Sequence, residues 1–248
     1  MLQPHIKLDS LHGANSAILP GDPGRLDHIK EYLNDVQELA YNREFRSLSG
    51  TYHGVKVIAL STGIGGSSTA IAIEELYALG IKRLIRIGSC GALQPGIAIG
   101  DLIIATGAVR DDGTSKAYID PIFPAVSDFS LIQHCRDYAI EQNWAHHLGI
   151  VHSHESFYID DNAAQEKKWS KTGVLGADME TAALLTVSRL RRIKACSILN
   201  NVVVYGQDTA AAINDYVDAA AMCLQGEGRE IQLALEAIRR DTAGISQE

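Results

Sequence analysis

The sequence predicts an α/β fold in which a central mixed, largely parallel sheet is flanked by helices. Short apolar runs typical of buried strands alternate with helical patterns from one end of the chain to the other. No linker, internal repeat or low-complexity stretch interrupts this alternation. We therefore expect a single domain that spans residues 1–248.

A strand–loop–helix–strand unit gives the clearest local pattern. Residues 55–60 form an apolar strand, 61–69 a glycine-rich loop, 70–80 a helix, and 84–92 a second strand with a turn. The right-handed crossover of such a unit makes its two strands parallel. The loop nearly matches a dinucleotide-binding fingerprint, but it lacks the third glycine and Arg86 replaces the expected acidic residue. A nicotinamide-dependent oxidoreductase therefore stays open as an alternative.

The other elements follow from the same criteria. Strands are expected at 17–20, 41–52, 101–106, 149–153 and 195–204, with 41–52 and 55–60 forming a hairpin. A helix is expected at 128–143, and a C-terminal helix at 214–240 with interruptions at Gly226 and Gly228. Residues 110–128 and 157–169 are expected to be loops, and long loops inside a compact domain are usually functional.

Arg86 stands inside the apolar run that ends in the turn Gly88-Ser89-Cys90-Gly91. A buried charge requires an anionic partner, and the N–H groups of a glycine-containing turn can themselves bind an anion. The pattern therefore predicts an oxyanion pocket at the carboxyl end of a central strand. The alternative is an edge-strand arginine that is paired with a surface acid. Gly21 and Arg25, where a helix is expected to start, form a second candidate anion site.

Composition narrows the classes of function. The formal net charge is -8, which argues against a nucleic-acid groove as the main function. No apolar run is long enough to cross a bilayer, and no signal peptide is expected. The four cysteines are far apart and form no CxxC pair, which favours a reducing, cytoplasmic location.

Two further features leave alternatives open. His152 and His154 share one face of a strand, but no carboxylate spacing completes a metal site, so we interpret them as polar residues at a strand end. Asp178 and Glu180 precede a strongly apolar helix. The helix dipole alone would favour acids there, yet the apolar surroundings predict that Glu180 is buried and paired.

Six motifs together resemble the nucleoside phosphorylase family, in its branch of uridine phosphorylases and hexameric purine nucleoside phosphorylases. They lie at residues 20–25, 42–45, 61–66, 86–92, 123–129 and 178–182, in the family's order. The resemblance covers the chain from His5 to about Val204. It implies phosphorolysis of a nucleoside to free base and pentose 1-phosphate, with inorganic phosphate as co-substrate and no organic cofactor.

The resemblance also implies roles for individual residues. Phosphate would be bound by Gly21, Arg25, Arg43, Arg86 and Ser89. The sugar would be bound by His5, Asp178, Met179 and Glu180, and Arg86, Glu180 and His5 are the expected catalytic residues. The base would be bound by Phe157, Gln165, Lys167, Cys90, Gly91, Tyr205 and Asp208. Glu44, Ile64 and Ser68 match the positions at which related enzymes hold a monovalent cation such as K⁺.

The resemblance further implies that active sites are shared between subunits. Arg43 and His5 would reach the site of a neighbouring subunit, so we expect a homo-oligomer, a hexamer, with no nucleic-acid or membrane partner. Asp178 replaces the first glutamate of the family's triplet, and the base-reading run is interrupted after Tyr158 by an apparent insertion before Gln165. We expect a pyrimidine nucleoside, uridine first. A purine nucleoside phosphorylase, a water-using nucleosidase and a non-catalytic nucleoside-binding module are the alternatives.

Overall fold

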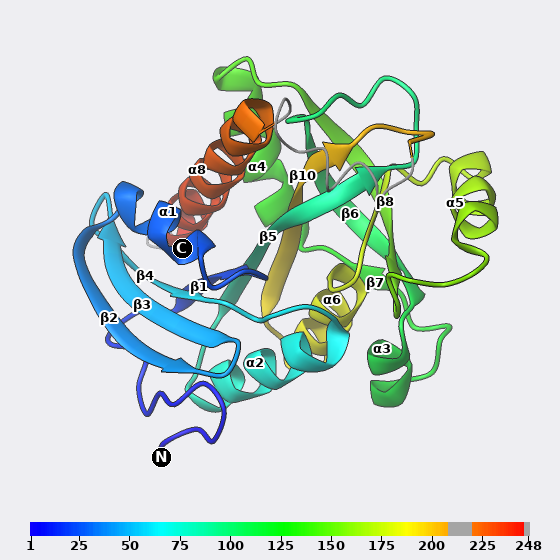
Figure 1. Cartoon of the computed structure of the whole chain (residues 1–248). Helices are drawn as coiled ribbons and strands as arrows, with labels where there is room; N and C mark the ends of the chain where they lie inside the picture. Colours follow the sequence, from blue (N-terminus) through cyan, green and yellow to red (C-terminus); the bar gives the residue numbers. More distant parts are fainter. Residues whose placement is uncertain (208–219, 246–248) are drawn as a thin grey trace.

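A central sheet runs through the computed structural model, which describes residues 1–207 and 220–245 (Figure 1). Its strands are β1 (Ser16–Pro20), β2 (Asn34–Asn42), β3 (Phe45–Tyr52), β4 (Val55–Leu60), β5 (Arg83–Ala92), β6 (Leu102–Asp111), β7 (Ala125–Val126), β8 (His146–His154), β9 (Gly176–Asp178) and β10 (Lys194–Val203). Hydrogen-bonded neighbours follow the order β10-β6-β8-β9-β5-β1-β4-β3-β2, with β7 beside β6 and an additional β10–β5 pairing.

The centre of the sheet is parallel, which confirms the predicted crossover unit. Strands β4 and β5 both pair in parallel with β1, and β10 pairs in parallel with β5. Strands β2, β3 and β4 form an antiparallel meander at one flank, and β6 runs antiparallel to β10 at the other. Strand β5 is therefore central. The alternative that placed Arg86 on an edge strand is wrong.

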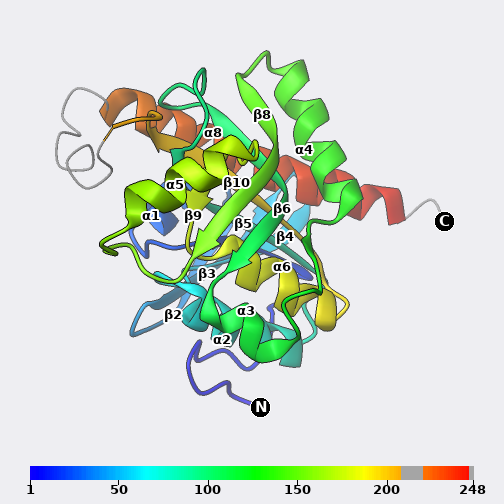
Figure 2. The same cartoon turned by 90° about the vertical axis from the view of Figure 1, so that its right-hand side faces the viewer.

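Helices cover both faces of the sheet (Figure 1). On one face lie α1 (Arg25–Ile29), the 3₁₀ turn η1 (Lys30–Tyr32), α4 (Phe129–Glu141) and α8 (Ala220–Ile245); on the other lie α2 (Gly66–Ala78), α3 (Gly113–Tyr118) and α6 (Thr181–Leu190). Side chains on β5 alternate between the two layers: Ile85 belongs to the core beneath α8, and Leu84 to the core beneath α2. Helix α5 (Asn162–Lys171) lies beside β8 (Figure 2).

Several expected boundaries were wrong. The strand expected at 41–52 is broken by a turn at Arg43 and Glu44, and Arg43 has a φ of 56°. Two segments expected to be loops hold helices: α3 lies within 110–128, and α5 begins within 157–169 and ends at Lys171. Asp112 begins α3 because its carboxylate accepts the Ser115 N–H at 2.6 Å.

The C-terminal helix α8 continues through both glycines at which an interruption was expected. Gly226 packs so closely on β10 that a Cβ there would lie 2.0 Å from Asn200 Oδ1. The glycine therefore lets the helix approach the sheet. The expected start of this helix, and Asp208, lie outside the described residues.

Two expectations from composition concern the cysteines and the helices in the part of the chain that the structure describes. Cys90, Cys135, Cys196 and Cys223 are all buried and free of disulfide bonds. Within residues 1–207 and 220–245, no helix combines the length and apolar character needed to cross a membrane.

Candidate active site

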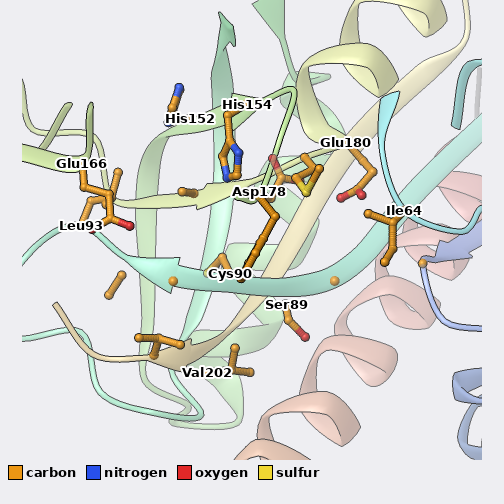
Figure 3. A pocket seen from close by; sticks show the side chains of 18 of the residues that line it. Ile64, Ser89, Cys90, Leu93, His152, His154, Glu166, Asp178, Glu180 and Val202 are labelled. Atoms are coloured by element: carbon orange, nitrogen blue, oxygen red, sulfur yellow. The ribbon is translucent and has the colours of Figure 1, made fainter. Parts of the chain in front are cut away.

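A cavity of about 1310 Å³ lies where β1, β5 and β10 end (Figure 3). The carboxyl ends of parallel strands are the usual place for ligand sites in α/β sheets. The cavity brings together most of the residues that the sequence singled out: Gly21, Arg25, Glu44, Ile64, Arg86, Ser68, Ser89, Cys90, Gly91, Phe157, Gln165, Lys167, Asp178, Met179, Glu180 and Tyr205.

Arg86 lies on the floor of this cavity and is 4% exposed. Its Nη2 donates to Glu180 at 2.5 Å, and its Nε donates to Asp178 at 3.2 Å. Its Nη1 is buried and has no hydrogen-bond partner among the described residues. An unpartnered guanidinium nitrogen in a cavity is a binding site for an anion, because burying it unsatisfied is costly.

Two glycines let the Arg86 guanidinium occupy this position. A Cβ on Gly88 would lie 2.5 Å from Arg86 Nη2, so any side chain at that position would displace the guanidinium. A Cβ on Gly21 would lie 4.0 Å from Arg86 Nη1 and 3.2 Å from the Gly63 carbonyl oxygen. The space beside the free nitrogen is thus kept open by the absence of side chains.

Arg25 approaches the same place from the opposite face of the sheet. Its guanidinium donates to Glu227 at 2.9 Å and, at 3.4 Å each, to the Ile87 carbonyl and the Ser89 hydroxyl. Its Nη1 also lies 3.2 Å from Glu230, which is fully buried. Burial raises the pKa of Glu230 to about 8, although Arg25 lowers it in part. Neither glutamate was predicted to belong to the site, since acids at helical spacing are typical of a solvated face.

Asp178 and Glu180 hold Arg86 in different ways. Asp178 accepts hydrogen bonds from Arg86, from Ser153 at 2.6 Å, and from the Thr181 N–H and hydroxyl at 3.0 and 2.7 Å. Its oxygens are therefore engaged by protein donors. Glu180 accepts the Gly65 N–H at 2.6 Å as well as Arg86, and burial raises its pKa. The predicted burial and pairing of Glu180 is confirmed.

His5 and Arg43 lie outside the cavity of their own chain. They are neighbours: Asn42 donates to the His5 carbonyl at 2.7 Å, and the His5 ring contacts Glu75 at 2.6 Å. Arg43 is exposed on the β2–β3 turn. Neither side chain therefore contributes to the cavity of its own chain.

The far end of the cavity is lined by residues of β8 and α5. Gln165 and Lys167, expected in a loop, instead lie on α5. Gln165 Nε2 donates to Asp161 at 3.0 Å, while its Oε1 is buried without a hydrogen-bond partner in the described ranges. His152 and His154 also line the cavity, which their interpretation as strand-end residues did not anticipate. The alternation of β8, which places both on one face, was the available signal.

No group of three or more histidine, cysteine, aspartate or glutamate side chains suited to a metal occurs within the described residues. At the expected cation position, the Ser68 hydroxyl lies 2.8 Å from a Glu44 carboxylate oxygen and also within hydrogen-bond distance of the Thr62 carbonyl oxygen, and its single proton is donated to one of the two. Ile64 is 80% exposed beside them. Carboxylate, hydroxyl and carbonyl oxygens are hard donors of the kind that alkali cations prefer, so this chemistry fits a monovalent ion.

Comparison with known proteins identifies the group to which this chain is related. A model of the phosphorylase superfamily matches residues 15–223. The chain belongs to the phosphorylase superfamily. A guanosine phosphorylase from Halorubrum lacusprofundi is 33% identical over 95% of this chain and 98% of its own length. A uridine phosphorylase from Thermococcus kodakarensis is 39% identical over 82% of this chain and 78% of its own.

A solved structure of another superfamily member superposes closely. The uridine phosphorylase from Vibrio fischeri ES114, complexed with 6-hydroxy-1-naphthoic acid, has a TM-score of 0.91 at 43% identity, covering 96% of each chain. The present chain therefore has the fold that its six motifs implied.

Proposed function

We propose that this superfamily member catalyses phosphorolysis of nucleosides, with a uridine-type pyrimidine nucleoside as the favoured substrate. The observation that carries the proposal is the free, buried Arg86 Nη1, beside Gly21, in a cavity that also holds Arg25 and Ser89. A phosphate dianion supplies negatively charged oxygens that can accept hydrogen bonds from these donors. The uridine phosphorylases from Thermococcus and Vibrio support the choice of nucleoside.

In the proposed reaction a phosphate oxygen attacks the anomeric carbon of the sugar. The bond from that carbon to the base nitrogen breaks, its electron pair leaves with the base, and the sugar becomes a pentose 1-phosphate. Arg25, Arg86 and Ser89 position the nucleophile, and the bound anion stabilises the oxocarbenium-like sugar in the transition state. Glu180 accepts hydrogen bonds from the sugar hydroxyls, and Met179 packs on the sugar. Asp178 holds Arg86 through the contacts described above.

The far end of the cavity takes the base in this proposal. Phe157 stacks on it, while Gln165, Lys167, Cys90, Gly91 and Tyr205 surround it. A uracil anion leaves more readily when its oxygens accept hydrogen bonds. A guanosine-type substrate is the second candidate, because the Halorubrum relative named guanosine phosphorylase covers nearly the whole chain.

The test is a nucleoside panel of uridine, thymidine, inosine, guanosine and adenosine, incubated with and without phosphate, with free base measured. Phosphate-dependent release, fastest from uridine, is the expected result. Release of base at the same rate with and without phosphate would instead indicate a water-using nucleosidase, which has no anionic nucleophile for the arginines to bind. Binding without any release would indicate a nucleoside-binding module.

We further propose that the active unit is a homo-oligomer, a hexamer built from dimers. His5 and Arg43 would complete the partner's site, His5 at the sugar and Arg43 at the phosphate. A monovalent cation at Glu44, Ile64 and Ser68 fits beside this contact surface. Sedimentation in K⁺ and in a bulky organic cation tests the assembly; a monomer that retains full activity would contradict it.

A further inference from the structure

His154 reaches the base end of the cavity from the last position of β8. Its ring points into the cavity (Figure 3). The arginines mark the phosphate end, and Glu180 with Met179 marks the sugar. His154 therefore lies where the proposed function requires the base, and that function gives it no role.

The tautomer of His154 is fixed by a backbone carbonyl two residues further along the chain. Nδ1 lies 2.9 Å from the Ser156 carbonyl oxygen. A carbonyl oxygen only accepts hydrogen bonds, so Nδ1 carries a proton, and in the singly protonated ring Nε2 presents a lone pair. Nε2 forms no hydrogen bond with any described residue, and His154 takes part in no ion pair among them. The ring thus offers the cavity a hydrogen-bond acceptor.

Neighbouring groups reinforce this acceptor character. His152 donates from Nε2 to Asp111 at 3.1 Å, and burial lowers its pKa, so it adds no positive charge beside His154. Gln165 gives its amide N–H to Asp161, which leaves its buried Oε1 as a second acceptor. The base end therefore holds two acceptors, each oriented by a hydrogen bond on its other side.

We propose that His154 reads the base, its Nε2 accepting a hydrogen bond from the ring N–H of an oxo base. Uracil and thymine carry this proton at N3, and hypoxanthine and guanine carry it at N1. Cytosine and adenine carry a lone pair at the equivalent ring nitrogen, which would face the lone pair of His154. The inference rests on the proposed function and deepens it: the substrate class is the oxo-base nucleosides. A site that hydrogen-bonds a substrate N–H rejects analogues that lack it.

Two replacements of His154 separate hydrogen bonding from shape. His154→Leu fills similar space without an acceptor, whereas His154→Gln retains an oxygen acceptor. Two nucleoside pairs report on the contact: uridine with 3-methyluridine, and guanosine with 1-methylguanosine, in which the methyl group replaces the ring N–H. His146→Leu is the matched control, because His146 also gives Nδ1 to a carbonyl, that of Trp144 at 2.8 Å, but lies at the other end of β8 outside the cavity.

We expect His154→Leu to lower kcat/KM for the unmethylated member of each pair by about ten- to a hundredfold, because the ring N–H of the base then has no hydrogen-bond acceptor. The methylated analogue and the KM for phosphate should change little, so the preference within the pair collapses. His154→Gln should retain most of the preference and turn over cytidine better than the wild type does, because its amide can rotate to donate. His146→Leu should match the wild type.

Failure of this inference and failure of the proposed function give different results. If the wild type releases base in a phosphate-dependent manner and His154→Leu keeps the wild-type preference, His154 does not read the base and phosphorolysis stands. If His154→Leu and His146→Leu lose activity equally on both members of a pair, the effect is structural and the inference is overturned. No phosphate-dependent release from any nucleoside would overturn both.

Discussion

Arg25 Nη1 lies 3.2 Å from the fully buried carboxyl group of Glu230, at the edge of the cavity that holds Arg86. Glu230 also accepts the Gly88 N–H at 3.2 Å, and Glu227 binds the other side of the Arg25 guanidinium. Asp178 and Glu180 occupy Arg86 in the same way. Two arginines therefore face four carboxylic acids, and the charge available to a phosphate depends on which of the acids are ionised.

Phosphate binding should weaken as the pH rises through about 8, the raised pKa of Glu230. Below that pH Glu230 is protonated and Arg25 keeps its charge for phosphate; above it, a buried carboxylate competes with the anion. The folded chain keeps the Glu230 proton up to about pH 8, whereas the unfolded chain releases it near the ordinary value of 4.5, so the free energy of unfolding should fall as the pH rises between these values and level off above pH 8. Phosphate KM measured on both sides of pH 8, and the free energy of unfolding measured below, at and above pH 8, test the two expectations.

The control for this prediction is a pair of glutamine variants. Glu230→Gln should remove the rise in phosphate KM above pH 8, since the amide cannot ionise. Glu227→Gln changes another partner of Arg25 and should keep the rise but move it to a lower pH, because the charge of Glu227 helps to raise the pKa of Glu230. An unchanged pH profile in Glu230→Gln would show that Glu230 does not control phosphate binding.

Arg86→Lys should lower kcat/KM by about a hundredfold or more, because an ammonium cannot bind Asp178, Glu180 and phosphate together as the guanidinium fork does. Arg86→Ala is a poorer test. It leaves two buried acids without their partner, which costs about 3–5 kcal/mol of stability. Thermal unfolding measured beside the kinetics separates the two effects, and a lysine variant with normal phosphate KM would place the anion elsewhere.

Gly88→Ala should inactivate the enzyme although no functional group is removed. The new Cβ would meet Arg86 Nη2 at 2.5 Å and push the guanidinium away from its acids. We expect a stability loss of about 1–3 kcal/mol from this overpacking, together with a raised phosphate KM. Gly244→Ala on α8 is the matched control, as nothing lies within 4 Å of its added Cβ. Equal behaviour of the two variants would contradict the proposed role of Gly88.

The sequence predicted the centre of the molecule well, because burial there leaves a simple pattern. Residues 57–60 and 84–87 are apolar apart from Arg86, and such a run is typical of a parallel strand that is buried on both faces. Arg86 was identifiable because a charge within that run needs an anion. Its protein partners were not identifiable, since Asp178 and Glu180 meet it only through folding.

The peripheral elements were harder to predict. Helix α5 buries none of its residues, so it has no apolar stripe to signal a helix. Glu230 lies between Arg229 and Ile231 on α8, and the fold brings it both Arg25 and the Gly88 N–H as buried partners. The Ser156 carbonyl fixes the His154 ring so that Nε2 can accept a hydrogen bond, and the fold places this ring in the same cavity as Gln165 of α5. Such roles depend on contacts that spacing along the chain does not encode.

Arg43→Ala and Arg86→Ala should complement each other when the two chains are co-expressed. Arg43 lies outside its own cavity, whereas Arg86 lies inside it, so in the proposed dimer each active site combines Arg86 of one chain with the partner's Arg43. Each variant alone should be inactive. In a mixed dimer one site has lost both arginines and the other has kept both, which predicts partial recovery of phosphate-dependent base release.

Arg86→Lys serves as the better-folded substitute for Arg86→Ala in the same mixture. The exposed Lys56, which donates to the His12 carbonyl far from the cavity, supplies a control in Lys56→Ala with activity expected to match the wild type. Hybrid assembly verified by differently tagged chains, yet with no recovered activity, would mean that Arg43 does not act in its partner's site.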